Sequence, residues 1–121
     1  MKYTRPTRRR RVVDHGLKAK LFRGLGDPSR LMIIDLLRDG PKCVYEIAES
    51  ARLSQPNASA HLACLGECGL VQKERRGKFI YYRVAHKEVT ALLNEADVIL
   101  ARVGDQIFQC TRYERDGKRT K

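Results

Sequence analysis

Cysteines are the residues of this sequence best suited to bind a metal: Cys43, Cys64, Cys68 and Cys110. Cys64 and Cys68 are four positions apart in a segment of helical spacing, so their side chains would lie on one face, one turn from each other. Two such thiolates can share one soft ion, and the negative end of a helix favours a cation there. Cysteine is also a small buried hydrophobe, but this pair lies to one side of the apolar stripe. We therefore predict half of a metal site.

A third ligand is needed for a sound thiolate site, and Cys110, after the last predicted helix, is the residue expected to supply it. Thiolates select zinc, cadmium, lead or copper(I). The same three cysteines leave a second hypothesis open, a thiol-redox or sulfur sensor in which Cys64 or Cys68 forms a disulfide with Cys110. Cys43 is interpreted as a packing residue.

Small polar side chains are concentrated in the first two turns of the helix that contains the cysteine pair. Recognition helices contact base edges with these turns. Gln55 and Asn57 have amides that can pair with adenine, while Ser54, Ser59 and His61 can reach bases or phosphates. The five residues are therefore predicted to contact DNA.

Two short helices and two longer ones are expected to position these residues. Residues 17–25 and 28–39 predict the first two helices, and the second is expected to bury Leu31, Ile34, Leu36 and Leu37. Residues 44–51 and 54–67 follow, separated by a tight link, with Ser54 as N-cap and a glycine just beyond the C-terminus. Two helices joined in this way predict a helix-turn-helix.

A β-hairpin is predicted after this pair of helices. The runs at 70–75 and 79–84 are rich in aromatic and β-branched residues. The tip between them contains Arg75, Arg76 and Lys78, where a winged helix-turn-helix presents its cations to DNA. The fold class expected is therefore mainly α with a small β-hairpin.

The last apolar segment predicts a surface for a second copy of the chain. Between residues 86 and 103 the apolar positions, with Leu93 among them, step by threes and fours in near-heptad fashion. This spacing is typical of a helix that pairs with a partner. We predict a homodimer formed through this helix.

Four stretches of the sequence resemble the ArsR/SmtB family of metalloregulatory repressors. They are residues 25–31, 53–62, 69–71 and 75–82, within a resemblance that extends over about residues 17–103. The resemblance implies a winged-helix homodimer, paired through its first and last helices, that binds double-stranded operator DNA and blocks a promoter until its inducer arrives.

The cysteine pattern is similar to that of the cadmium- and lead-sensing members of this family. That similarity implies Cd(II) or Pb(II) as inducer, with Zn(II) also possible, held by Cys64, Cys68 and Cys110. In those members the tail cysteine comes from the other subunit. The sequence leaves open whether Cys110 acts within one subunit or between two.

Charge and length limit the remaining alternatives. Of the formal net charge of +11 over 121 residues, most lies in the two termini. We expect a basic, flexible arm at 1–14, a folded domain at 15–104 and a ligand-bearing tail at 105–121. Basic arms suit a polyanion, so a nonspecific nucleic-acid architectural protein is the rival from another class.

Several classes of protein are not expected. We find no catalytic Ser/His/Asp set, phosphate loop or suitably spaced pair of carboxylates, so the chain is not expected to be an enzyme. No apolar run reaches the roughly 18 residues of a membrane span, and the Arg-rich start lacks the apolar stretch of a secretory signal. The expected location is the cytoplasm, where the cysteines stay reduced.

Overall fold

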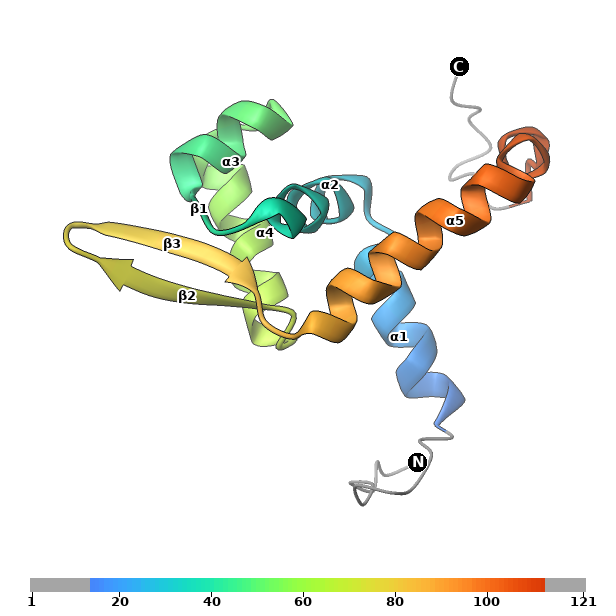
Figure 1. Cartoon of the computed structure of the whole chain (residues 1–121), viewed down its shortest axis with the longest axis horizontal. Helices are drawn as coiled ribbons and strands as arrows, with labels where there is room; N and C mark the ends of the chain where they lie inside the picture. Colours follow the sequence, from blue (N-terminus) through green and yellow to red (C-terminus); the bar gives the residue numbers. More distant parts are fainter. Residues whose placement is uncertain (1–13, 113–121) are drawn as a thin grey trace. The chain divides into compact units, whose positions relative to one another are not determined.

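The computed structural model describes residues 14–112 and divides into two compact units between His86 and Lys87. Most of the predicted basic arm and the tail beyond Arg112 lie outside the described residues. The first unit contains, in chain order (Figure 1), α1 (His15–Leu25), α2 (Pro28–Leu36), the 3₁₀ turn η1 (Leu37–Asp39), β1 (Lys42–Cys43), α3 (Val44–Ala51), α4 (Gln55–Glu67), β2 (Val71–Arg76) and β3 (Phe79–Val84). The second unit contains α5 (Lys87–Gln109).

The link between α1 and α2 is fixed by side-chain hydrogen bonds to backbone groups. The Asp27 carboxylate accepts the backbone N–H of Arg30 at 3.0 Å, as expected of an N-cap residue before a proline. The Arg30 side chain in turn donates from Nε to the carbonyl oxygen of Gly24, 2.8 Å away near the end of α1. The predicted start of the second helix at residue 28 is confirmed.

The buried face of α2 differs from the predicted one. Ile33 and Ile34 are 0% exposed and Leu37 is 2% exposed, whereas Leu31 is 39% exposed. Leu36 is only half-buried, so the prediction was wrong for Leu31 and Leu36. The segment is apolar at nearly every position, and its periodicity therefore could not select one face.

Helices α3 and α4 form the predicted helix-turn-helix. Arg52 ends α3 in the left-handed conformation with φ 58°, and this residue lets the chain turn within a few positions. Ser54 then caps α4, because its Oγ accepts the backbone N–H of Asn57 at 3.1 Å. The buried residues of these two helices supply much of the core: Ile47, Ala48, Ala51, Ala58, Leu62 and Leu65.

A third strand, absent from the predicted elements, completes the sheet. The strand order is β1-β3-β2, and the two-residue β1 pairs antiparallel with β3 through Lys42 opposite Tyr82 and Cys43 opposite Tyr81. A segment of two residues has no periodicity to detect. Cys43, the N-cap residue of α3, is thus paired with a strand of the hairpin, which forms the wing.

The hairpin turn is tighter than the predicted three-residue tip. Arg76 pairs with Phe79, so only Gly77 and Lys78 form the loop. Gly77 has φ +64° and Lys78 has no positive φ, as in a type II′ turn with glycine first. Arg76 therefore belongs to β2 rather than to the loop.

The second unit, α5, contains two helical segments that meet at a kink. The sequence predicts that α5 ends near Val103, and Val103 does depart from helical geometry, with φ −126° and ψ 17°. The predicted helix end therefore coincides with this kink, and a second helical segment follows it as far as Gln109, the end of α5. Large apolar side chains remain exposed along it: Val98, Ile99, Leu100, Ile107 and Phe108. None of the described helices is long and apolar enough to cross a membrane.

Candidate DNA interface and metal site

Helix α4 presents three different stripes of side chains. The stripe in the core consists of Ala58, Leu62 and Leu65, each at most 1% exposed. At about 100° per residue, one side of this stripe presents a set that we call the cysteine flank: Asn57, His61, Cys64 and Cys68. The opposite side presents a set that we call the wing flank: Gln55, Ser59, Ala63 and Gly66. The predicted base-reading residues are therefore divided between the two flanks.

The end of α4 fixes the positions of the two cysteines. Cys68 is the C-cap residue, and its backbone N–H donates to the Cys64 carbonyl at 3.1 Å. Beyond it, Leu70 N–H donates to the Leu65 carbonyl at 2.9 Å while Gly69 adopts φ +79°. These are the bonds of a Schellman motif, which ends the helix sharply. Both thiols thus lie in the last turn, where the helix dipole favours a cation.

Exposure distinguishes these two cysteines from the core. Cys64 is half-buried and Cys68 is exposed, and both are free thiols. A pair of soft ligands one turn apart, open to solvent on one side, suits an ion that arrives from solution. The residues therefore fit a thiophilic metal, with room for further ligands.

The other two cysteines lie in different surroundings. Cys110 is half-buried directly after α5, in the second unit, and its backbone N–H donates to the carbonyls of Gln106 and Ile107. Within residues 14–112 of one chain, no group of three or more histidine, cysteine or acidic side chains is placed to hold a metal. The structure thus places Cys64 and Cys68 in one helical turn of the first unit, whereas Cys110 belongs to the second unit.

Cys43 has a structural role at the start of α3. Its backbone N–H donates to Glu46 Oε1 at 2.9 Å at the start of α3. This bond to the Cys43 backbone, together with a bond to its side chain, lowers the pKa of the Glu46 carboxyl, and nearby Lys42 acts in the same direction. The arrangement is a capping box, in which the N-cap and third residues satisfy each other's backbone donors.

Predicted DNA-binding residues at the start of α4 are accessible. Gln55, Asn57 and Ser59 are exposed, and His61 is half-buried. The Ser54 oxygen accepts the Asn57 N–H, so its hydroxyl keeps one hydrogen to donate to a ligand. The Asn57 side-chain amide has no hydrogen bond among residues 14–112, and it can pair with a base edge.

The wing arginines project from opposite faces of the sheet, because side chains alternate along a strand. Arg76 shares the outer face with Glu74 and Tyr81. Its Nε lies 3.1 Å from Glu74 Oε2, and its guanidinium carbon lies 5.0 Å from the centroid of the Tyr81 ring. Arg83 also approaches Glu74, at 3.4 Å. Arg76 therefore has an acidic and an aromatic partner on this face.

The inner face of the hairpin contains two cations, of which Arg75 was predicted from the sequence and Lys73 was not. Arg75 lies on this face with Lys73, two residues earlier, and the cross-strand partner of Lys73 is Tyr82. Val71, farther along the same face, is 3% exposed and belongs to the core. Side chains alternate between the two faces of a strand, and this pattern could have predicted that Lys73 shares a face with Arg75, toward α4.

A helix-turn-helix followed by a hairpin with cations at its tip defines a winged helix-turn-helix DNA-binding protein rather than an enzyme. The family model of the bacterial regulatory proteins of the arsR family matches residues 27–73. The chain belongs to this family of transcriptional repressors.

Two relatives and one solved structure illustrate the similarity. A probable mercury resistance operon repressor of Streptomyces lividans is 36% identical over 100 residues, which is 83% of this chain and 80% of the relative. The transcriptional regulator CmtR of Mycobacterium bovis is 37% identical over 89 residues, 73% of this chain and 75% of CmtR. The homodimeric winged helix-turn-helix domain Mb0332, also from M. bovis, superimposes with a TM-score of 0.67 at 29% identity, covering 83% and 90% of the two chains.

Proposed function

We propose that the chain is a homodimeric, metal-responsive repressor that leaves its operator when a soft metal ion binds Cys64, Cys68 and Cys110. The observation on which this proposal depends is the cysteine flank of α4. Two accessible thiols share one side of the recognition helix with Asn57 and His61, two of the side chains expected to read DNA. Metal binding and DNA binding would therefore act on the same helix.

Ligand chemistry and similarity both favour a soft ion. Thiolates bind Cd(II) and Pb(II), which the resemblance noted from the sequence implies, and they also bind Zn(II). The relative from S. lividans is described as a mercury resistance operon repressor, so Hg(II) joins the set of candidate inducers. The third thiolate would be Cys110 of the same chain or of its partner.

Exposed apolar side chains support the homodimer. The C-terminal half of α5 leaves Ile99 55%, Leu100 50% and Phe108 71% exposed. On α1, Leu17 and Phe22 are 41% and 51% exposed. Such surfaces mark protein interaction sites, and the similar domain Mb0332 is homodimeric.

Coupling between the two ligands is the quantity to measure. An ion releases DNA only if it binds the free protein more tightly than the DNA-bound protein, so DNA must weaken metal binding by the same factor. A coupling of about 1–3 kcal/mol would change operator affinity by roughly 5- to 150-fold.

The test begins with selection of a preferred site from a random duplex library, using the full chain under anaerobic conditions. Cd(II), Pb(II), Hg(II) and Zn(II) are then titrated separately while DNA affinity and sulfur-to-metal charge-transfer absorption are followed. We expect one preferred sequence and its release by a thiophilic ion. Binding without sequence preference would indicate an architectural protein. Release that requires an oxidant and no ion would indicate a redox sensor.

A further inference from the structure

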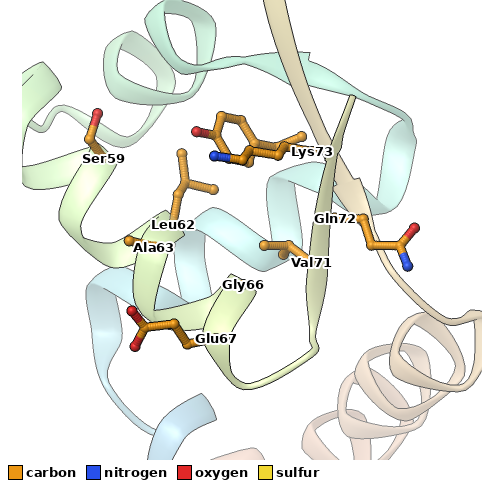
Figure 2. Close-up of a pocket in the computed structure, with 9 residues that line it drawn as sticks. Ser59, Leu62, Ala63, Gly66, Glu67, Val71, Gln72 and Lys73 are labelled. Atoms are coloured by element: carbon orange, nitrogen blue, oxygen red, sulfur yellow. The ribbon is translucent and has the colours of Figure 1, made fainter. Parts of the chain in front are cut away.

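A pocket lies between the wing flank of α4 and the hairpin, on the side of the helix opposite the cysteines. Its volume is about 530 Å³. Among the residues that the helix contributes, Ser59, Ala63 and Gly66 are small and leave the space open. Figure 2 shows these residues on α4 with Lys73 on the facing strand. We call this space the wing pocket.

Besides Gln72, whose amide oxygen accepts from Arg83, the lining of the wing pocket has three side-chain donors: the Lys73 ammonium and the hydroxyls of Tyr82 and Ser59. Lys73 and Tyr82 are directly opposite each other in the hairpin, so both side chains leave the same face of the sheet. In Figure 2 the Lys73 side chain extends from β2 across the pocket toward α4. Among residues 14–112 none of the three donor groups has a hydrogen-bond or ion-pair partner.

The charge distribution selects one end of the pocket for an anion. Glu67 also lines the pocket, and its carboxylate lies beside the last turn of α4, away from Ser59 (Figure 2). Ser59 belongs to the N-terminal half of α4, where the helix dipole is less unfavourable to negative charge. Arg75, two residues beyond Lys73, adds a second cation on the same face of β2.

We infer that Lys73, Tyr82 and Ser59 bind one phosphate group of the DNA backbone in the wing pocket. This inference rests on the proposed DNA-binding function. A phosphodiester matches the three donors, because it presents acceptor oxygens and one negative charge. The pocket also lies between the two elements expected to contact the duplex, the recognition helix and the wing. The contact sets the register of α4 on the DNA and reads no base.

Two variants test the inference by removing donors that the fold does not use. Lys73→Gln removes the charge from an exposed side chain, and Tyr82→Phe removes only a hydroxyl. Lys20→Gln, on exposed α1, is the control for an equal change in net charge. We expect Lys73→Gln to weaken binding about tenfold, equally for the selected site and for a random 30-base-pair duplex. The slope of log affinity against log salt should fall by about one per lost contact, and Lys20→Gln should change neither quantity.

A third variant and a titration without DNA separate the other outcomes. Ala63→Glu adds a carboxylate to the pocket wall and should weaken DNA binding as Lys73→Gln does. If Lys73→Gln binds DNA like the wild type, the inference is overturned. If inorganic phosphate then shifts the amide resonances of Lys73 and Tyr82 in the wild type only, the pocket is a site for a free anion. If the wild-type chain binds no duplex, the proposed function itself fails.

Discussion

Cys64 and Cys68 are joined through the backbone, because the N–H of Cys68 donates to the carbonyl of Cys64 at 3.1 Å. Both thiols consequently belong to one turn, and any change in the last turn of α4 alters their separation. The same turn ends in a Schellman motif, which fixes where Cys68 lies relative to the start of β2. A shared ion would therefore find the two ligands in a defined position.

Serine at Cys64 or at Cys68 breaks the pair of thiolates within one helical turn, so it should prevent metal binding, abolish sulfur-to-metal charge-transfer absorption and leave a repressor that binds DNA but ignores metal. Serine is nearly isosteric with cysteine, so the fold should persist, but its hydroxyl is a poor ligand for a soft ion. Cys110→Ser should leave weaker metal binding by two thiolates, with little release of DNA. Anaerobic absorption titrations and fluorescence anisotropy of labelled duplex measure the two properties. A normal metal response in the Cys64 and Cys68 variants would refute the site.

Cys43→Ser is the matched control for these cysteine variants. Cys43 is the N-cap of α3, and serine is a preferred residue at that position. We expect unchanged metal affinity, unchanged DNA release and no loss of thermal stability. A metal response lost in this variant alone would move the site to the start of α3.

Asn57→Ala should cost about 1–3 kcal/mol of operator binding and relax sequence preference at one base pair. The helix cap should survive, since Ser54 bonds the backbone N–H of Asn57 and not its side chain. Gln106→Ala, which removes an exposed amide from α5, is the control. Repeating the site selection with each variant measures the preference, and an unaltered consensus for Asn57→Ala would remove this residue from the reading surface.

Arg76→Ala should weaken binding to all DNA sequences alike. It should also lower the slope of log affinity against log salt by about one for each lost contact. The Arg76 guanidinium pairs with Glu74 and lies over Tyr81, which orients its charge on the outer face of the hairpin. Tyr81→Leu should have a smaller effect of the same kind, because Arg76 keeps its charge and loses its support. Affinities for selected and random duplexes at several salt concentrations measure these effects. If Arg76 reads a base, Arg76→Ala should weaken binding to the selected duplex more than to the random one.

Ile99→Asp should convert the dimer to a monomer. Ile99 is 55% exposed in the single chain, so the substitution removes apolar contact between subunits without burying a carboxylate in the fold. Leu93 is a poorer choice because it is only 5% exposed, and an aspartate there would destabilise the chain itself. Ala101→Asp, on the exposed side of the same helix, is the control. Sedimentation velocity distinguishes the species, and a dimeric Ile99→Asp variant would place the interface elsewhere.

Protonation of Glu46 should make the first unit less stable at acidic pH. Its pKa is lowered in the folded protein by bonds to Cys43, so the carboxylate contributes stability above its ordinary pKa. That contribution is lost as the pH falls through the lowered pKa of the folded state. Glu46→Gln should therefore show a smaller drop in free energy of unfolding between neutral and acidic pH. Urea titrations at both pH values measure it, and equal drops would exclude a role for Glu46.

Sequence spacing predicted the helix-turn-helix and the hairpin because strong local signals mark their ends. Ser54 caps α4 and Gly69 ends it, both at the predicted positions. Local pattern could not predict β1, which depends on pairing with residues about forty positions away. Lys73 was missed because a lone lysine in a strand is ordinary. Only its placement opposite Tyr82 and across from α4 indicates a binding function.

The pairing of Cys43 with Tyr81 links the hairpin to the start of α3 in the helix-turn-helix. A swing of the hairpin alone would break the ladder between β1 and β3 and disturb the cap of α3. The close packing of α4 likewise opposes a tilt of that helix within the first unit. An inducer would then act by reorienting the two DNA-binding units of a dimer as whole bodies. Hydrogen exchange within β1, β3 and α4 should consequently be the same with and without the ion, even as DNA is released.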